Sequence, residues 1–218
     1  MSDVSDVSDV NLQIVVVAKQ PLPGKVKTRL QPQCTPHQAA RIAEAALADT
    51  LTTASRTPAA RRILLLDGDY PAPPGWEVTK QRGDGLAARL ANGFAETARP
   101  GLATLLIGMD TPQVTAALLA AVVDGLSDRD AMLAPAEDGG WWALALRDPR
   151  HGQALAAVPM SQPDTGKLTH EALAHQGLSV GLAPCLRDVD TIGDLHTVVA
   201  LCPEGSHFTR AVSAMELR

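Results

Sequence analysis

Aromatic residues are scarce in this sequence: they make up 3% of its 218 residues, although 45% of the residues are hydrophobic. A core must therefore be filled by aliphatic side chains, chiefly leucine, valine and alanine. Cysteine is scarce as well, because Cys34, Cys185 and Cys202 are the only ones and include no C-x-x-C pair. They indicate neither a disulfide framework nor a zinc knuckle, so we expect three reduced thiols in a cytoplasmic protein.

An excess of positive charge is also missing. The chain has 19 Lys and Arg residues against 24 Asp and Glu residues, and the tail repeat SDVSDVSDV carries part of the acidic excess. Binding to nucleic acid depends on dense positive charge, so we expect no nucleic-acid partner. No apolar run approaches the ~18 residues of a membrane span, and the start shows no signal-peptide pattern. We therefore expect no membrane association.

The best-known hydrolase motifs are absent too. The histidines show no H-E-x-x-H spacing, and no G-x-S-x-G sequence marks a nucleophile. These absences disfavour zinc hydrolysis and serine acyl transfer.

What the chain does contain is an alternation of apolar strands and amphipathic helices. The repeat over residues 1–10 predicts a disordered acidic leader, and residues 11–218 fit a single domain. The alternation predicts an α/β fold with a mainly parallel sheet covered on both faces. We expect strands at residues 12–19, 62–67, 76–80, 102–107, 131–135, 141–146 and 178–183, and helices at residues 35–54, 86–98, 113–126, 165–176 and 193–201.

Polar clusters follow several of these strands, and ligands of open α/β sheets bind at the carboxyl ends of strands. In the first loop, which begins at Lys19, Gly24 permits close approach to the backbone, and Lys25, Lys27 and Arg29 supply three cations. Such a loop suits a polyphosphate. It lacks the spacing of a P-loop, and the alternative is a solvated basic loop.

Aspartates follow two later strands. Asp110 ends a buried strand, and its carboxylate is a ligand type that magnesium prefers, although it could instead help to cap the helix predicted to begin after Thr111-Pro112. Asp188 and Asp190 provide two further carboxylates, also at a junction between a strand and a helix. Asp194 forms a capping box with Thr191 and is structural. A cation shared with Asp110 requires the two segments to be adjacent.

The segment Glu137–Gly140 has two interpretations. Asp-Gly and Gly-Gly are strong hairpin signals, so it could be a turn and no more. Alternatively it is an acceptor-binding loop, in which Asp138 binds a hydroxyl group or the water shell of a metal. Trp141 or Trp142 then forms a wall of the pocket, and the other indole belongs to the core.

The segment Gln81–Gly85 precedes a predicted helix. Gly83 and Gly85, together with the free N–H groups of the helix start, could hold a nucleotide. A simply capped helix start is the alternative.

Taken together, four segments resemble the bacterial rSAM/selenodomain-associated transferase family of the glycosyltransferase-A, or nucleotide-diphospho-sugar transferase, superfamily: VVVAKQPLPGKVKTRL, GMDTP, PAEDGGWWALAL and RDVDTIGDL. The likeness covers nearly the whole chain after the leader. It extends more loosely to phospholactate guanylyltransferase and molybdenum-cofactor guanylyltransferase.

The resemblance implies a three-layer α/β/α sandwich around a mixed sheet, with Mg²⁺ or Mn²⁺ as cofactor. By motif, it assigns nucleotide-phosphate contacts to Lys19, Gly24, Lys27 and Arg29, metal binding to Asp110 with Asp190 or else Asp188, and the second substrate to Asp138 and Gly139. The chain departs from the family at Val158–Gln162, where relatives often have Val-Pro-Trp-Ser-Thr. It also lacks the Gly-Gly fingerprint of sugar nucleotidyltransferases, which leaves the base unassigned.

We therefore expect a metal-dependent nucleotidyltransferase that moves a nucleoside monophosphate from a nucleoside triphosphate to a small phosphate or oxyanion acceptor. Lys27, Arg29 and Asp110 are its expected catalytic residues. Glycosyl transfer from a nucleotide sugar is the first alternative, and a non-catalytic nucleotide-binding protein is the second. A homodimer is compatible with each.

Overall fold

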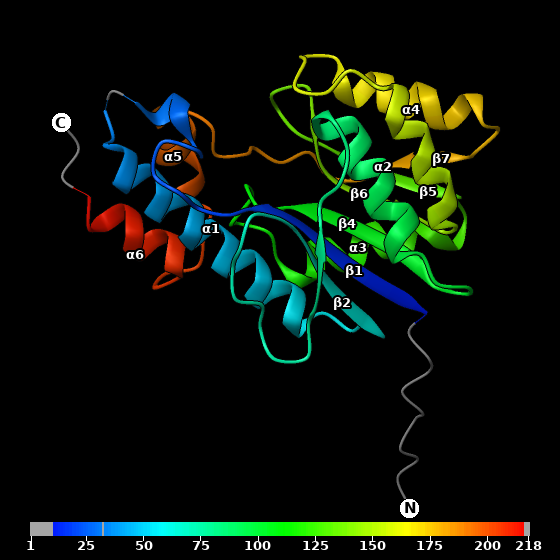
Figure 1. The fold of residues 1–218 in the computed structure, drawn as a ribbon, viewed down its shortest axis with the longest axis horizontal. Helices are drawn as coiled ribbons and strands as arrows, with labels where there is room; N and C mark the ends of the chain where they lie inside the picture. The colour runs from blue at the N-terminus through cyan, green and yellow to red at the C-terminus, as the bar shows by residue number, and fades with distance from the viewer. Residues whose placement is uncertain (1–10, 32, 216–218) are drawn as a thin grey trace, which may run out of the picture.

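The computed structural model describes residues 11–31 and 33–215, and the leader predicted over residues 1–10 lies outside this part of the chain. Its centre is a seven-stranded sheet with the order β3-β2-β1-β4-β6-β5-β7 (Figure 1). The strands are β1 (Leu12–Lys19), β2 (Arg61–Asp67), β3 (Glu77–Lys80), β4 (Ala103–Gly108), β5 (Ala131–Pro135), β6 (Trp141–Leu146) and β7 (Val180–Leu182). Only β6 runs antiparallel to its neighbours, β4 and β5. The sheet is therefore mixed and mainly parallel, as predicted.

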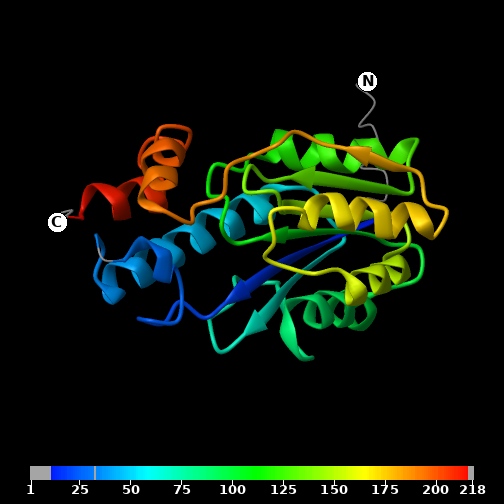
Figure 2. The same ribbon diagram turned by 90° about the horizontal axis from the view of Figure 1, so that it is seen from above.

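Helices cover both faces of the sheet. One face packs against α1 (Pro36–Arg56) and α3 (Ala116–Asp124), which η2 (Gly125–Ser127) follows. The other face packs against α2 (Gly85–Thr97), η3 (Pro149–Ala157) and α4 (Thr165–His175). A third apolar cluster joins the beginning of α1 to η1 (Thr28–Leu30), α5 (Ile192–Val199) and α6 (His207–Ser213). Figure 2 shows these last helices as a lobe beside the sheet, which we call the α5–α6 lobe.

Strand β1 explains why the apolar runs of this sequence form a two-sided sheet. Val16 contributes to the core beneath α1, whereas its neighbour Val15 contributes to the core beneath α2. Both side chains are fully buried. A central parallel strand is buried on both faces and so needs a continuous apolar run instead of an alternating one.

The helix predicted over residues 113–126 begins later than expected. Helix α3 starts at Ala116, and the side chain of Thr115 accepts a hydrogen bond from the backbone N–H of Leu118 at 3.2 Å. Thr111 and Pro112 belong to a turn, in which the Val114 N–H donates to the Thr111 carbonyl oxygen at 3.1 Å. The prediction was wrong because the threonine nearer to the helix forms the cap.

Other helix starts agree with their sequence signals. Thr191 and Asp194 form the predicted capping box at α5, and Thr35 and Gln38 form another at α1. The sequence did not predict η3 or α6. Among the residues that the structure describes, no helix combines the length and the hydrophobicity that are required to traverse a bilayer.

Candidate active site

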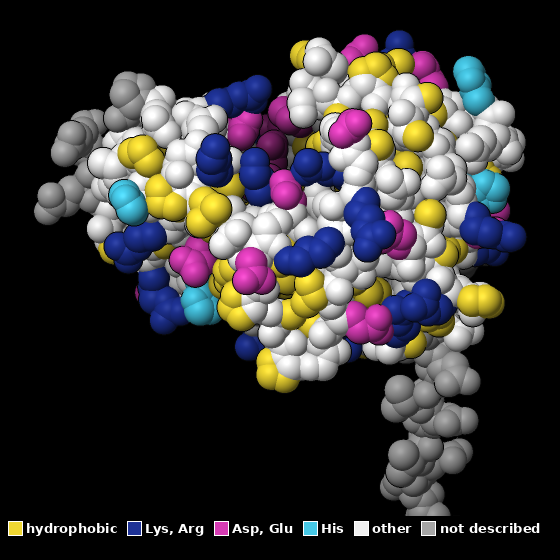
Figure 3. Space-filling view, viewed as in Figure 1, with side chains coloured by type: hydrophobic (Ala, Val, Ile, Leu, Met, Phe, Trp, Pro, Cys, Tyr) yellow, Lys and Arg dark blue, Asp and Glu magenta, His cyan; other side chains and the backbone are white. Residues whose placement is uncertain are grey.

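The carboxyl ends of β1, β2 and β4 meet the β5–β6 turn at one edge of the sheet. A cavity of about 380 Å³ opens there. Figure 3 shows a hollow beside the α5–α6 lobe in which acidic and basic side chains gather. The polar and charged side chains in the cavity wall belong to Lys19, Asp67, Gln81, Arg89, Asp110, Thr111, Asp138, Ser161, Gln162, Thr165 and Asp188. This edge is where a parallel sheet offers its backbone and loops to a ligand.

Lys27 is the best anchored of the predicted phosphate-binding residues. Its side chain is 7% exposed, and its Nζ atom lies 2.7 Å from Oδ1 of Asp110 and 3.9 Å from Oδ1 of Asp190. The backbone of Lys27 is left-handed, with φ at 48°. A non-glycine residue adopts this conformation at a cost in free energy, which the surrounding contacts must offset. The ion pair with Asp110 is the contact that holds this ammonium group in place.

Arg29 and Gly24 lie in the same loop but take different positions. Nη1 of Arg29 lies 2.5 Å from Oδ2 of Asp190, and the Arg29 side chain is 70% exposed. Gly24 has φ at 74°, and a side chain placed there would meet no atom within 4 Å. Neither residue is part of the cavity wall, whereas Lys19 is. The loop thus gives the acidic cluster two cations and leaves its glycine open to solvent.

The segments that carry Asp110 and Asp190 are adjacent, which the sequence could not show. The backbone N–H of Val189 donates to the carbonyl oxygen of Asp110 at 3.0 Å. The two carboxylates share the ammonium group of Lys27, so the structure places a cation between them. Within residues 11–31 and 33–215, no cluster of three or more Asp, Glu, His or Cys side chains could enclose a metal ion.

The segment Glu137–Gly140 is a hairpin turn and also part of the cavity wall. The Gly140 N–H donates to Oδ1 of Asp138 at 2.8 Å, and the Ala136 N–H donates to the Gly140 carbonyl oxygen at 3.0 Å. Asp138 and Trp141 line the cavity, and Trp141 Nε1 donates to Thr169 Oγ1. The predicted turn is therefore present, and its place in the cavity wall leaves acceptor binding as a prediction.

Gly139 joins this turn to the start of α4. Its carbonyl oxygen accepts a hydrogen bond from the Gly166 N–H at 2.8 Å. A Cβ atom at Gly139 would lie 1.8 Å from the carbonyl oxygen of Pro163, and φ is 89°. Only glycine permits this contact between two backbones.

Asp188 and Asp138 both line the cavity. Burial, together with the negative charge of Asp138, raises the pKa of the Asp188 carboxyl to about 6. The positive charge of Lys27 acts in the opposite direction but does not outweigh burial. Asp188 is thus a carboxyl that ionises with difficulty, whereas Asp190 is paired with two cations.

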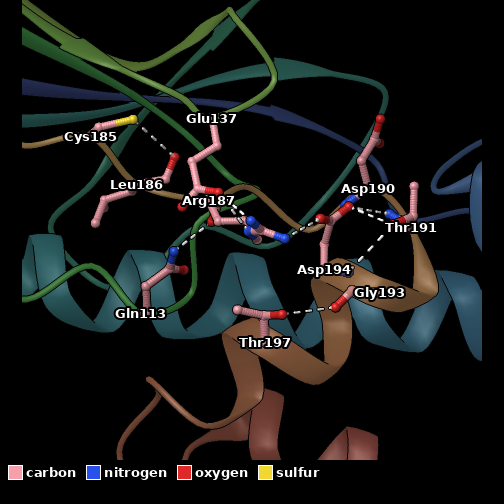
Figure 4. Close-up of polar contacts among 10 residues, drawn as sticks. All are labelled: Gln113, Glu137, Cys185, Leu186, Arg187, Asp190, Thr191, Gly193, Asp194 and Thr197. Atoms are coloured by element: carbon pink, nitrogen blue, oxygen red, sulfur yellow. Dashed lines mark hydrogen bonds and ion pairs between the residues drawn. The ribbon is translucent and has the colours of Figure 1, made fainter.

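Arg187 fixes the segment that carries these aspartates (Figure 4). Its guanidinium group binds Oε2 of Glu137 through Nε, at 2.9 Å, and through Nη2. Its Nη1 atom lies 3.4 Å from Oδ1 of Asp194, which belongs to the capping box of α5. Nε2 of the buried Gln113 donates to the Arg187 carbonyl oxygen at 2.5 Å. Sequence reasoning missed Arg187 and Gln113, although Arg187 stands directly before Asp188.

The opposite part of the cavity is built around another ion pair that was not predicted. Arg89 Nη1 lies 2.8 Å from Asp67 Oδ2, and Arg89 Nε donates to the carbonyl oxygen of Gly83 at 3.2 Å. Gly83 and Gly85 have φ at 119° and 80°, and neither is part of the cavity wall. Sequence reasoning missed the pairing of Arg89 with Asp67. Its one sequence signal was a basic residue in the first turns of the helix predicted over residues 86–98.

Comparison with solved structures identifies the fold. A protein from Desulfovibrio desulfuricans, provisionally assigned as a nucleotide-diphospho-sugar transferase, is 24% identical, with a TM-score of 0.82 over 93% of this chain and 94% of that one. The Mycobacterium tuberculosis protein Rv0371C, solved in complex with manganese, is 25% identical, with a TM-score of 0.56 over 86% of this chain and 96% of that one. CMP:2-keto-3-deoxy-manno-octonic acid synthetase, solved with CTP, is 14% identical, with a TM-score of 0.57 over 87% and 98%. The predicted three-layer α/β/α sandwich of the nucleotide-diphospho-sugar transferase type is therefore confirmed.

Sequence comparison places the chain in a family. No curated protein matches the sequence. Residues 33–162 match the model of a family described as uncharacterized proteins conserved in bacteria, DUF2064. This match covers more than half of the chain and includes Asp110, Asp138 and Arg89. The chain therefore belongs to the DUF2064 family.

Proposed function

We propose that this protein is a nucleotidyltransferase, which moves a nucleoside monophosphate from a nucleoside triphosphate to a small acceptor and releases pyrophosphate. The observation that carries the proposal is the arrangement of Lys27 between Asp190 and Asp110, of which Asp110 lines the cavity. Neighbouring structures support it, since they include a synthetase solved with CTP and a cytidylyltransferase from Thermus thermophilus. The narrower assignment to the rSAM/selenodomain-associated transferases rests on the sequence motifs.

The basic residues of the first loop would neutralise the phosphates. Lys27 and Arg29 are held at the acidic cluster, and Lys19 extends from the end of β1 in the cavity wall. Stabilising the charge that develops on the leaving pyrophosphate is the main requirement of this chemistry. Gly24, Gly83 and Gly85 would let phosphates or the base approach the backbone closely.

The donor set fits a hard divalent cation that shares its shell with phosphate oxygens. Asp110 and Asp190 are the carboxylates that would hold the cation, in the position that the Lys27 ammonium group occupies in the structure, and magnesium commonly uses one or two carboxylates together with substrate phosphates. Mg²⁺ or Mn²⁺ bound there would supply charge neutralisation on the phosphate oxygens. The manganese complex of the Mycobacterium tuberculosis neighbour supports this choice.

The acceptor would occupy the part of the cavity bounded by Asp138, Gly139 and Trp141. An oxygen of the acceptor attacks the α-phosphorus, a new oxygen–phosphorus bond forms, and the bond to the bridging oxygen of the β-phosphate breaks. A phosphate or other oxyanion is already ionised, so this attack needs no strong general base. Asp138 and Asp188 would accept hydrogen bonds from hydroxyl groups elsewhere on the acceptor.

Glycosyl transfer from a nucleotide sugar is the second candidate. The high structural similarity to the Desulfovibrio desulfuricans protein, assigned to nucleotide-diphospho-sugar transferases, favours it. In that reaction Asp138 would assist an acceptor hydroxyl, and a nucleoside diphosphate would leave in place of pyrophosphate. A nucleotide-binding protein without activity is the remaining candidate. It does not explain the pairing of Lys27 and Arg29 with Asp110 and Asp190.

A coupled assay for pyrophosphate separates these functions. The protein is incubated with magnesium or manganese, each of the common nucleoside triphosphates, and a panel of phosphorylated or oxyanion acids. Release of pyrophosphate that requires both the metal and an acceptor supports the proposal. Hydrolysis of nucleotide sugars without pyrophosphate supports glycosyl transfer. Cleavage of neither class of nucleotide, despite binding, supports the non-catalytic candidate.

We further propose that the protein acts in the cytoplasm. The three cysteines are free, which is compatible with a reducing cytoplasm, and a small-molecule acceptor is the expected partner. A homodimer is testable by light scattering during purification.

A further inference from the structure

Thr111 is a buried hydroxyl whose bonding is incomplete. The residue is 2% exposed, and its Oγ1 atom has no hydrogen-bond partner among residues 11–31 and 33–215. It lies in the cavity wall directly after Asp110. The helix cap predicted for it is formed by Thr115 instead, so no local structural role accounts for the hydroxyl.

Thr111 differs from the other buried threonines in lacking a hydrogen-bond partner for its hydroxyl. Each of them has a partner for its hydroxyl oxygen within the described part of the chain. They are Thr50, Thr57, Thr97, Thr104, Thr165 and Thr169. Burial of a polar group without a partner costs free energy, and most buried polar groups are therefore paired. Thr111 is a residue of the cavity wall, so a group from a ligand in the cavity would satisfy its hydroxyl.

The strand order places Thr111 between the two halves of the cavity. Strand β4, which it follows, lies between β1 and β6. On the β1 side the wall carries Lys19 and Arg89, and on the β6 side it carries Asp138. If a nucleotide fills the first half and an acceptor the second, the group that passes between them must lie at the end of β4.

Resting on the proposed function, we propose that Thr111 is a catalytic residue, whose hydroxyl donates a hydrogen bond to a non-bridging oxygen of the α-phosphoryl group during transfer. The backbone that carries the hydroxyl is held before substrate binds, because the Thr111 carbonyl oxygen accepts a hydrogen bond from the Val114 N–H, so the donor needs little reorganisation in the transition state. It complements the charged groups, because a neutral donor does not repel the cations beside it.

Two substitutions at Thr111 and one matched control test this role. Thr111→Val replaces the hydroxyl by a methyl group of similar size, and Thr111→Ser keeps the hydroxyl. Thr104→Val is the control, since Thr104 is also buried but its Oγ1 accepts a hydrogen bond from Gln13 Nε2 at 2.8 Å. Urea unfolding and the kinetics of pyrophosphate release are measured for all three variants.

Thr111→Val is expected to unfold at the same urea concentration as the wild type or at a higher one, because the hydroxyl has no partner to lose. Its kcat should fall about 100-fold with little change in KM, as expected for a donor that acts in the transition state. Thr111→Ser should keep kcat within about threefold of the wild type. Thr104→Val should unfold at lower urea and keep its kcat.

A lower urea midpoint for Thr111→Val would show that the hydroxyl is bonded within the protein and would overturn the inference. An unchanged kcat in Thr111→Val, while the wild type releases pyrophosphate, would overturn the role of Thr111 alone. Absence of pyrophosphate release from the wild type would overturn the proposed function and, with it, the ligand assigned to Thr111.

Discussion

The two ends of the candidate site differ in how their charges are satisfied. At one end Lys27 and Arg29 are paired with Asp110 and Asp190 before any substrate is bound. At the other end Asp188 lies near the negative charge of Asp138, and the described residues include no salt-bridge partner for it. We call these the paired end and the unpaired end.

The difference shows which parts of the site the protein organises without a ligand. The paired end is held by attraction between its own side chains, so its geometry is set in the free protein. The unpaired end retains a raised carboxyl pKa at Asp188, and Thr111, which lies between the two ends, retains an unsatisfied hydroxyl. Groups of this kind cost free energy in the free protein and are satisfied when a ligand binds.

The largest effect should come from breaking the paired end. Asp110→Asn removes the charge that holds Lys27, so we expect metal-dependent release of pyrophosphate to fall by at least about 100-fold. The coupled assay measures this loss. Asp128→Asn, which changes an exposed aspartate away from the cavity, is the control and should keep full activity. Magnesium-dependent nucleotide affinity that is unchanged in Asp110→Asn would contradict the assignment of Asp110.

A nearly equal effect is expected at the wall of the unpaired end. In Gly139→Ala the new Cβ would overlap the Pro163 carbonyl oxygen, so unfolding free energy should fall by about 3 to 5 kcal/mol. Gly75→Ala is the matched control, because Gly75 also has a positive φ but has open space around it. That variant should lose only about 1 kcal/mol. Equal losses in urea unfolding would show that the turn and α4 are not locked together.

A smaller effect on activity is expected at Arg187, which joins the turn at Glu137 to the segment of the acidic cluster. Arg187→Gln releases Glu137 and Asp194 from the segment that carries Asp188 and Asp190. We expect kcat to fall about tenfold, while unfolding free energy changes by about 1 kcal/mol or less, because the ion pairs are partly exposed.

Arg150→Gln serves as the control for this change, since Arg150 pairs with Asp148 outside the cavity. Its kcat should equal that of the wild type. A loss of stability in Arg187→Gln that fully accounts for the loss of activity would remove Arg187 from the positioning role.

The smallest effect concerns the pH dependence of stability. The pKa of Asp188 is raised to about 6 in the folded protein, so its ionisation costs free energy as pH rises from about 4 to about 6. Asp188→Asn avoids this cost. After allowance for solvent screening, the variant should be more stable by about 1 kcal/mol above pH 7 and equal to the wild type near pH 4. Urea titrations that give the same difference at both pH values would refute the shift.

Much of the fold could be predicted because its signals are local. The strands at residues 131–135 and 141–146 have the predicted boundaries, since each apolar run ends at a turn that the sequence marks clearly. Capping boxes marked the starts of α1 and α5 for the same reason. At α3 two adjacent threonine signals competed, and the sequence alone favoured Thr111 over Thr115.

What could not be predicted depends on contacts between distant residues. Helix α6 begins where the carboxylate of Asp49 accepts hydrogen bonds from the backbone N–H groups of His207 and Phe208. Ser206 also caps α6 locally, since its side chain accepts a hydrogen bond from the Thr209 N–H, but no sequence spacing encodes the contribution of Asp49 from another helix. The same holds for the site, where the pairing of Asp67 with Arg89 and of Glu137 with Arg187 appears only in three dimensions.

The central claim is that the nucleoside monophosphate is the group transferred. It is tested most directly by following label from a nucleoside triphosphate marked either at the α-phosphorus or at the γ-phosphorus. With metal and acceptor present, the account predicts that α-label enters the acceptor product and that γ-label appears in pyrophosphate. If α-label stays in free nucleotide while the sugar of a nucleotide sugar reaches the acceptor, the account is contradicted.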